Sequence, residues 1–373
     1  MKTEVVIIGA GVIGLAIAKS LSEAGKEVMI IDQDGFGTKA SGTNLGQLSI
    51  SDRDYALEYN LVMESLDIYA QTQNRRNLEY KKTGGIFPIE TQEDLKIAME
   101  LVRQKQKLGY NIELLLGEGI KEVEPKIEDI LGAIYCPDEG RVNPFLVNSW
   151  LMDEAIENGI EVLLYHKVKD FRIEKNIIKG VVLEDRVMEA DTIILATGAW
   201  SKDLMANIGI ELEIDYIRGS ALVTQPFPKI IRGPVADGCY FNGNIPEDQF
   251  VFFGGVQQEN GTVIVSQASR NVSDYDTSLD FFDMSDMAQL FLKHFPVLED
   301  ALVVRAWSGV TTTTPDAKPY WGYTNKYKNL FLAIAFKGAF SLAPAVGQYT
   351  AQWVVDGDIE EEKKIWTPIL RNI

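Results

Sequence analysis

The chain has 373 residues, of which 46% are apolar, and a net charge of −18. This length favours two domains, and the composition is that of an ordinary globular protein. The negative charge argues against nucleic acid or an anionic membrane as a partner, because both bind basic surfaces. No apolar run reaches the roughly 18 residues that a membrane-spanning helix requires. A cytoplasmic protein is therefore expected.

Side chains that bind metals or act as nucleophiles are scarce. The two cysteines, Cys136 and Cys239, are far apart, and the histidines are His166 and His294. This pattern argues against a disulfide framework, a zinc site, an iron–sulfur cluster or a Ser-His-Asp hydrolase within the chain. We therefore expect no metal site.

The chain begins with a β-branched apolar run, a glycine-rich turn and a helical pattern. The turn has the spacing Gly-x-Gly-x-x-Gly. The first glycine permits a tight turn, the second lets the backbone approach a pyrophosphate, and the third lets helix and strand pack closely. Free N–H groups at the helix N-terminus then face the anion. The motif predicts a dinucleotide bound by Gly9, Gly11, Val12, Ile13 and Gly14.

A second strand, residues 27–31, leads to an acidic residue. Asp32 lies about 20 positions after the glycines, where a carboxylate accepts hydrogen bonds from the adenosine ribose. Asp32 and the adjacent Gln33 are therefore assigned to the cofactor site. The order of strand, glycines, helix, strand and acid favours a dinucleotide site over a turn that binds nothing.

The rest of the chain alternates between helical and strand-like segments. Helices are expected at residues 53–80, 92–109, 144–158, 285–295 and 344–355, and strands at residues 83–89, 160–164, 168–173, 177–183, 192–198 and 330–335. Residues 216–266 are aromatic and alternating, which is typical of antiparallel strands. These patterns predict an α/β fold with a Rossmann-like domain and a second, α+β domain built on an antiparallel sheet.

Segments typical of the nucleotide domain occur at the start, middle and end of the chain, so both domains are expected to be discontinuous. The cofactor-binding domain is assigned to residues 1–80, 141–214 and 309–373. The substrate-binding domain is assigned to residues 81–140 and 215–308.

A series of short motifs runs along essentially the whole chain. They are Gly9-x-Gly11-x-x-Gly14 with Asp32, and residues 40–47, 83–85, 140–144, 196–201, 218–219, 254–255, 314–319 and 342–347. In this order they resemble the flavin-dependent amine and amino-acid oxidoreductases, the family of D-amino-acid oxidase, glycine oxidase and sarcosine oxidase. Within it, the chain is most similar to dehydrogenase-type subunits that act on secondary amino acids.

The resemblance implies a noncovalently bound FAD, because residues 308–312 lack the cysteine that tethers flavin in some sarcosine oxidases. A polar, glycine-rich loop would wrap the pyrophosphate and the flavin edge through Ser41, Gly42, Asn44, Gly46 and Gln47. The alternative is that these residues form only a surface loop. The adenine, ribose and pyrophosphate would lie near Val168, Ala196, Thr197, Gly198 and Trp200. The flavin would lie near Gly309, and the last turn and helix would stabilise the N1–C2=O edge of reduced flavin: Gly338, Ala339, Phe340, Ser341 and Leu342.

The resemblance also implies oxidation of the C–N bond of a small amino acid or secondary amine, such as proline, hydroxyproline, sarcosine or an opine. Hydride transfer to flavin N5 would give an imine. Lys337 and Arg218 are the candidate catalytic residues, although Arg218 has a structural ion pair as its alternative role. Contacts with the substrate are assigned to Tyr216, Arg218, Tyr240, Trp307, Thr311 and Lys337.

Two departures from the family pattern concern the substrate. Thr311 stands near the place where glycine-oxidase-like relatives carry an arginine, and Ala335-Phe336 replaces the usual Gly-His. A glycerol-3-phosphate-type FAD oxidoreductase, a nicotinamide-linked dehydrogenase and a noncatalytic subunit of this fold remain alternatives. The expected partners are a small amine or amino acid and iron–sulfur or electron-transfer subunits, in an oligomer.

Overall fold

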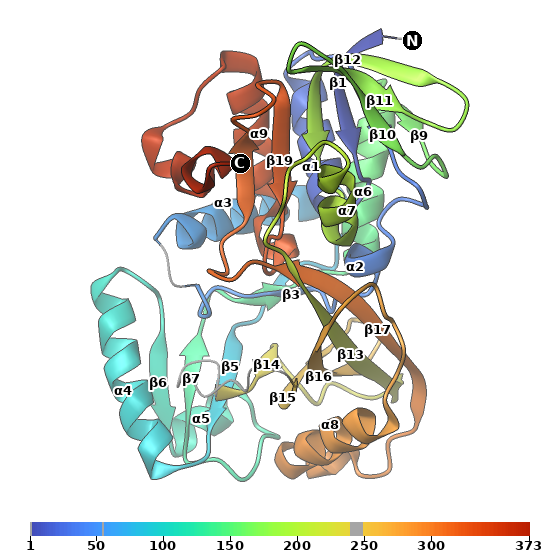
Figure 1. Ribbon diagram of the computed structural model, residues 1–373. Helices are drawn as coiled ribbons and strands as arrows, with labels where there is room; N and C mark the ends of the chain where they lie inside the picture. Colours follow the sequence, from blue (N-terminus) through green and yellow to red (C-terminus); the bar gives the residue numbers. More distant parts are fainter. Residues whose placement is uncertain (1, 54–55, 239–248) are drawn as a thin grey trace.

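The computed structural model describes residues 2–53, 56–238 and 249–373 of the chain. Figure 1 shows two sheets, one above the other, each with its own helices. The upper sheet contains the N-terminal strand, and the lower sheet contains most of the middle of the chain.

The upper sheet has eight strands around a parallel core. The core runs in the order β9 (Glu161–Leu163), β2 (Val28–Ile31), β1 (Lys2–Ile8), β12 (Val187–Leu195) and β19 (Leu330–Ile334). Antiparallel pairs add β10 (Asp170–Glu174), β11 (Ile177–Val182) and β18 (Tyr320–Tyr323). The carboxyl ends of the parallel strands meet at one edge, where ligands of such sheets bind.

Both faces of this sheet are buried, as the apolar runs predict. Val5 and Ile7 of β1 pack into one core, whereas Val6 and Ile8 pack into the other. The first core includes α1 (Val12–Glu23), α3 (Ala56–Gln73), α6 (Pro144–Glu157) and α9 (Ala339–Asp356), and the second includes α7 (Ser201–Ala206).

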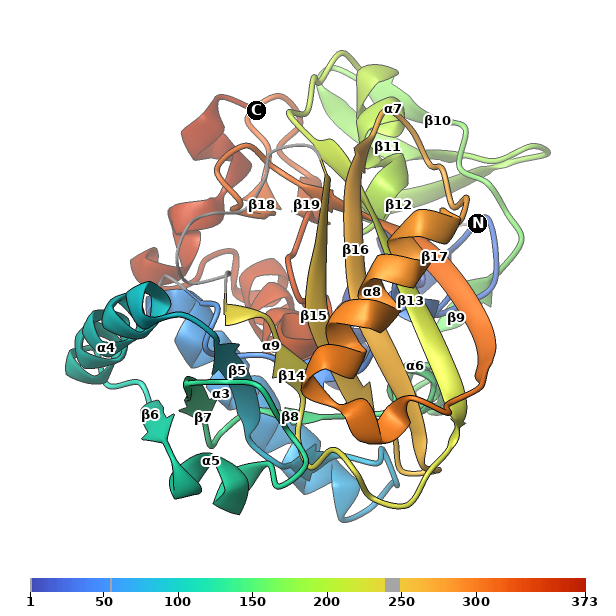
Figure 2. The ribbon, with the colours of Figure 1, turned by 90° about the horizontal axis from the view of Figure 1, so that it is seen from below.

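The lower sheet also has eight strands. Its order is β17 (Val303–Thr313), β13 (Asp215–Pro226), β16 (Thr262–Val272), β15 (Gln249–Gln257), β14 (Val235–Ala236), β5 (Gly85–Ile89), β7 (Gly132–Cys136) and β6 (Glu113–Leu116). Neighbours are antiparallel except β14 and β5, which pair in parallel. Helix α8 (Phe281–His294) covers one face (Figure 2), with Met287 and Phe291 in the core.

The remaining elements are short or lie at the margins. Helices α4 (Gln92–Lys107) and α5 (Glu118–Val123) flank β6 (Figure 2), and a small sheet joins β3 (Gln47–Leu48), β8 (Gly140–Arg141) and β4 (Lys81–Lys82). Short helical turns are α2 (Lys39–Gly42), η1 (Gly198–Trp200), η3 (Pro296–Leu298), η4 (Glu361–Trp366) and η5 (Pro368–Arg371). In the described part of the chain, every helix is too short or too polar to cross a bilayer.

This architecture confirms the predicted α/β fold, with a Rossmann-like sheet and a second, largely antiparallel sheet. The domain limits stay a prediction, and β17 runs across one of them. Some element limits were predicted wrongly: the helix expected to reach residue 80 ends at Gln73, and the strand expected from residue 168 begins at Asp170.

The last helix begins at Ala339 rather than near Pro344, which lies inside it. Proline lacks the N–H that would bond the carbonyl of the residue four positions earlier, here Phe340. Helix α3 replaces that bond, because the Tyr69 hydroxyl donates to the Phe340 carbonyl at 2.8 Å. The Ser65 hydroxyl accepts from the Ala345 N–H at 3.1 Å. Tertiary contacts therefore stabilise a helix start that the proline concealed.

Candidate functional site

A cavity of about 1000 Å³ lies between the two sheets. Residues at the carboxyl ends of β1, β2, β12 and β19, at the starts of α1 and α9, and on β13, β16 and β17 line it. Pockets for small ligands and cofactors span roughly 300–1000 Å³, so this cavity has room for a large ligand.

The start of α1 faces the cavity with its backbone. Gly11 is the N-cap, and the Ser41 hydroxyl accepts from the Val12 N–H at 3.0 Å. Gly9 has φ +111°, and a Cβ there would lie 2.3 Å from the Ala196 carbonyl oxygen. A Cβ on Gly14 would lie 2.0 Å from the Gly9 carbonyl oxygen. The close packing that these glycines permit leaves the positive end of the helix open to an anion.

Asp32 lies directly after β2, at the same edge. Its Oδ2 accepts from the Ala10 N–H and its Oδ1 from the Asp34 N–H, both at 2.7 Å. Burial raises the pKa of Asp32, and these two bonds act in the opposite direction. Each carboxylate oxygen can accept a second bond. The backbone N–H of His166 donates to the backbone carbonyl of Asp32 at 2.8 Å. This bond brings Val168 to the same end of the cavity.

The other end of the cavity lies beyond β19. Because β1 and β12 separate β2 from β19, the strands that precede Asp32 and Lys337 lie about three strand spacings, or ~14 Å, apart. Gly338, with φ +61°, caps α9, and its neighbours Lys337 and Ala339 line the cavity. The lining also includes polar residues at alternate positions of β16 and on β17: Gln267, Ser269, Asn271, Thr311, Thr312 and Thr313.

The residues expected to hold the cofactor fall into two groups. The larger group lines the cavity: Gly9, Gly11, Val12, Ile13, Asp32, Gln33, Ser41, Asn44, Val168, Ala196, Thr197, Gly198, Trp200, Gly338, Ala339 and Phe340. The smaller group is not part of this lining: Gly14, Gly42, Gly46, Gln47, Gly309, Ser341 and Leu342.

The second group supports the lining. A Cβ on Gly46 would lie 2.0 Å from the Val142 carbonyl oxygen, and one on Gly309 would lie 2.1 Å from Thr43 Oγ1. The Ser341 hydroxyl accepts from the Ser49 N–H at 3.0 Å. These residues permit or hold the close approach of the loop at residues 40–47 and of the first turn of α9.

The residues expected to contact the substrate are not all brought together. Thr311 and Lys337 line the cavity, Tyr240 is outside the described residues, and Tyr216, Arg218 and Trp307 lie outside the lining. The Trp307 indole N–H donates to the Thr43 carbonyl at 3.1 Å.

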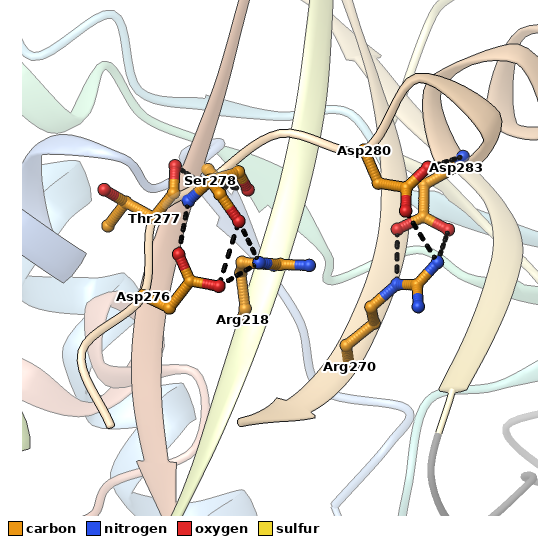
Figure 3. Close-up of polar contacts among 8 residues, drawn as sticks. Arg218, Arg270, Asp276, Thr277, Ser278, Asp280 and Asp283 are labelled. Atoms are coloured by element: carbon orange, nitrogen blue, oxygen red, sulfur yellow. Dashed lines mark hydrogen bonds and ion pairs between the residues drawn. The ribbon is translucent and has the colours of Figure 1, made fainter. Parts of the chain in front are cut away.

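Strand alternation explains the position of Arg218. Its neighbour Ile217 lines the cavity, so Arg218 points to the opposite face of β13. Tyr216, two positions earlier, shares that face. In the register of the sheet Arg218 lies opposite Arg270, which binds Asp280 and Asp283 at the start of α8 (Figure 3).

Arg218 makes an ion pair instead of lining the cavity. Its Nη1 donates to the Asp276 carboxylate and, at 2.5 Å, to the Ser278 hydroxyl (Figure 3). The Ser308 hydroxyl donates to the Thr277 carbonyl at 2.6 Å. The segment 273–280 is thus anchored to β13 and β17. This placement favours the structural role of Arg218 over a catalytic one.

Sequence reasoning missed Asp52 beside Lys337, with 3.3 Å between Asp52 Oδ2 and Lys337 Nζ. Burial alone would raise the pKa of Asp52, but the charges of Arg53, Lys337 and Lys105 lower it well below its usual range. It also missed the polar wall of β16, although polar residues at alternate positions 267, 269 and 271 are a visible signal. The Asp52 contact joins segments far apart in the sequence, and no local pattern marks it.

The family model described as "FAD dependent oxidoreductase" matches residues 4–353. The chain is 24% identical to glycine oxidase from Pseudomonas putida over 368 residues, 92% of each protein. It is 24% identical to 4-methylaminobutanoate oxidase (formaldehyde-forming) from Paenarthrobacter nicotinovorans, across 94% of this chain and 43% of that protein. The crystal structure of L-proline dehydrogenase from P. horikoshii matches with a TM-score of 0.89 and 25% identity, over 98% of this chain and 97% of that one.

The cavity fits FAD in its own geometry. The start of α1 is open to a pyrophosphate, Asp32 has acceptor capacity for a ribose, and the start of α9 offers a second positive helix end. Cys136 is buried and lies outside the lining. Since the family model spans most of the chain and the cavity has the features such a cofactor requires, the chain belongs to the FAD-dependent oxidoreductases.

Proposed function

We propose that this protein oxidises the C–N bond of a small amino acid or secondary amine, with proline, hydroxyproline, sarcosine and opines as candidate substrates. The observation that carries the proposal is that Lys337, a cationic residue, lines the cavity beyond β19, away from Asp32. A fixed cation there suits a substrate carboxylate. The relatives' names, which specify glycine, 4-methylaminobutanoate and L-proline, support a substrate of this class.

FAD, when bound, supplies the oxidant that accepts a hydride from the carbon bearing nitrogen, and water hydrolyses the resulting imine. The residues of the chain bind and orient. Lys337 would hold the carboxylate, and Thr311 and the polar face of β16 would offer hydrogen bonds to the rest of the substrate. An amine that binds in its neutral form needs no protein base to release the hydride.

The test is an anaerobic screen of flavin bleaching over glycine, sarcosine, D- and L-proline, hydroxyproline, opines and glycerol 3-phosphate. We expect at least one amine to bleach the flavin without added NAD. Bleaching by glycerol 3-phosphate alone would instead support an alcohol oxidoreductase. NAD reduction without bleaching would support a nicotinamide-linked dehydrogenase, and a purified protein without flavin would support a noncatalytic subunit.

We further propose that the reduced enzyme passes its electrons to a partner subunit in a hetero-oligomer. Mixing the substrate-reduced protein with oxygenated buffer tests this directly. Reoxidation much slower than anaerobic reduction would support a separate acceptor, whereas reoxidation as fast as reduction would make oxygen the acceptor.

A further inference from the structure

We infer that Asp52 and Arg53 are positioning residues that hold Lys337 by its two ends and set the charge that it presents to the cavity. The inference deepens the proposed function, and it rests on that function for the role of Lys337 toward a carboxylate. Asp52 and Arg53 follow the loop at residues 40–47 in the sequence. Both contact Lys337, which lies in the turn before α9.

Arg53 holds the backbone end of Lys337. Its side chain is 1% exposed, and its Nη1 donates to the Lys337 carbonyl at 2.9 Å. Its Nη2 is buried and makes no hydrogen bond within the described residues. A Cβ on Gly338 would lie 2.3 Å from this Nη2. The guanidinium therefore lies directly against the turn that begins α9, and only a glycine leaves room for it there.

Asp52 holds the side-chain end. Its Oδ2 lies 3.3 Å from Lys337 Nζ, and the two side chains are 17% and 53% exposed. Lysine has a long, flexible stem, so without a partner its ammonium would sample a wide volume. The carboxylate restrains the ammonium at the wall of the cavity and offsets part of its charge.

Asp52 and Arg53 are themselves held by buried groups. Lys105 Nζ, from α4, donates to the Ser51 carbonyl at 2.5 Å and to the Arg53 carbonyl at 2.7 Å. The Tyr110 hydroxyl donates to the Arg53 carbonyl at 3.2 Å. Glu139 Oε1 accepts from the Ser51 N–H at 2.9 Å. Because these bonds fix the backbone on both sides of Asp52, its carboxylate is a rigid partner for Lys337.

This arrangement predicts effects of opposite sign. A substrate carboxylate or any other anion must compete with Asp52 for the Lys337 ammonium. Removing the Asp52 charge should therefore favour an anion in the cavity, and removing Lys337 should disfavour it. A merely structural role predicts weaker binding after either change, because both would loosen the same turn.

Sulfite is a suitable probe, since it adds reversibly to oxidised flavin, leaves a negative charge on the adduct and requires no substrate. In the FAD-loaded protein we expect Asp52→Asn to tighten the sulfite complex about three- to tenfold, and Lys337→Met to weaken it by a similar factor. The double variant should lie close to Lys337→Met, because Asp52 acts mainly by restraining and neutralising the Lys337 ammonium, and its direct repulsion of the anion is a smaller effect. The midpoint potential of the bound flavin should rise in Asp52→Asn and fall in Lys337→Met.

Arg53 is tested by a conservative and a disruptive change. Arg53→Met should lower sulfite affinity toward that of Lys337→Met, and Arg53→Lys should recover part of it. Asp52→Ser serves as the second variant if Asp52→Asn does not fold, and thermal melting identifies folded protein. If the wild-type flavin does not react with sulfite, the midpoint potentials of the bound flavin serve as the test. They are expected to rise in Asp52→Asn and to fall in Lys337→Met.

Shifts of the same sign in Asp52→Asn and Lys337→Met, or Asp52 variants equal to wild type in both measurements, would overturn the inference. An Asp52→Asn effect as large without Lys337 as with it would also overturn it. These outcomes are independent of the substrate. If no amine bleaches the flavin but the opposite signs are found, the proposed function fails while the positioning role stands.

Discussion

The two ends of the cavity are built in different ways. At the Asp32 end, a single β–α–β segment supplies the backbone N–H groups, the close-packed glycines and the carboxylate. Other parts of the lining come from β13, β16, β17 and the start of α9, where Lys337 contacts Asp52 and Arg53. One end depends on local backbone geometry, and the other depends on how distant segments are placed.

This difference has a functional meaning. A pyrophosphate and a ribose can be bound by a unit that folds from neighbouring residues, so that unit can stay the same while the other end changes. The second end is set by strand register, where a shift of one residue exchanges Ile217 for Arg218 at the cavity wall. Substrate specificity is therefore expected to depend on the residues at the Lys337 end.

The largest effect is expected from breaking the Asp32 end. In Gly9→Ala the new Cβ would lie 2.3 Å from the Ala196 carbonyl oxygen at a positive φ. Strain and displacement of the turn should cost about 3 kcal/mol or more of stability and prevent tight FAD binding. The flavin-to-protein ratio after purification measures this. The control is Gly25→Ala, which also has a positive φ, +80°, but whose Cβ would meet no atom within 4 Å among the described residues. Normal flavin content in Gly9→Ala would contradict the account.

The next largest effect tests whether Arg218 has a structural role outside the cavity. Arg218→Met removes the ion pair with Asp276, so it should lower the melting temperature by several degrees and leave flavin content unchanged. Arg270→Met, on the same face of the sheet, is the matched control and should behave alike. A variant of Arg218 with normal melting but a raised KM for the substrate would return this residue to the active site.

A pH-dependent effect is expected far from both ends, at Glu124. This side chain is buried, and burial raises its pKa to about 7, while the backbone N–H of Arg232 acts against the shift. Between its unfolded value near 4.5 and about 7, the folded protein binds more protons than the unfolded chain, so stability falls as pH rises through this window.

Glu124→Gln removes this titration. From pH 5 to pH 8 the variant should lose about 2 kcal/mol less stability than wild type. Urea unfolding at the two pH values measures the difference, and flavin binding should stay normal. Parallel pH profiles in variant and wild type would show that Glu124 is not buried as a neutral acid.

The smallest effect concerns the start of α9. Tyr69→Phe removes the donor to the Phe340 carbonyl that Pro344 leaves without its helical partner, which should cost about 1 kcal/mol. The exposed Tyr165→Phe is the control. Because this turn lines the cavity, FAD should also dissociate faster from Tyr69→Phe, as flavin fluorescence would report. Equal stability in both variants would contradict this role for Tyr69.

Much of the fold was predictable from sequence because its signals are local. Apolar runs marked β1, β2, β12 and β19, and glycine spacing marked the start of α1. The start of α9 was placed at Pro344 because proline is favoured in the first turn of a helix and disfavoured inside one, and the compensating Tyr69 lies in another part of the chain.

The residues of the candidate site also differ in whether a local sequence pattern marks them. Gly9, Gly11 and Asp32 carry a pattern within one segment, and the structure places all three in the cavity lining. Arg218 was selected for its charge, but its direction depends on strand alternation within an assembled sheet. Asp52 and Arg53 were missed because their importance comes from contacts with Lys337, which lies near the other end of the chain.

The central claim is that FAD lies across this cavity, with its pyrophosphate at the start of α1 and its flavin toward Lys337. A crystal structure of the purified, yellow protein tests it most directly. The account predicts density for FAD with a ribose hydroxyl on Asp32 and the isoalloxazine beside the turn at Gly338. Density for FAD elsewhere, in the reverse orientation, or a cavity without FAD after soaking would contradict it.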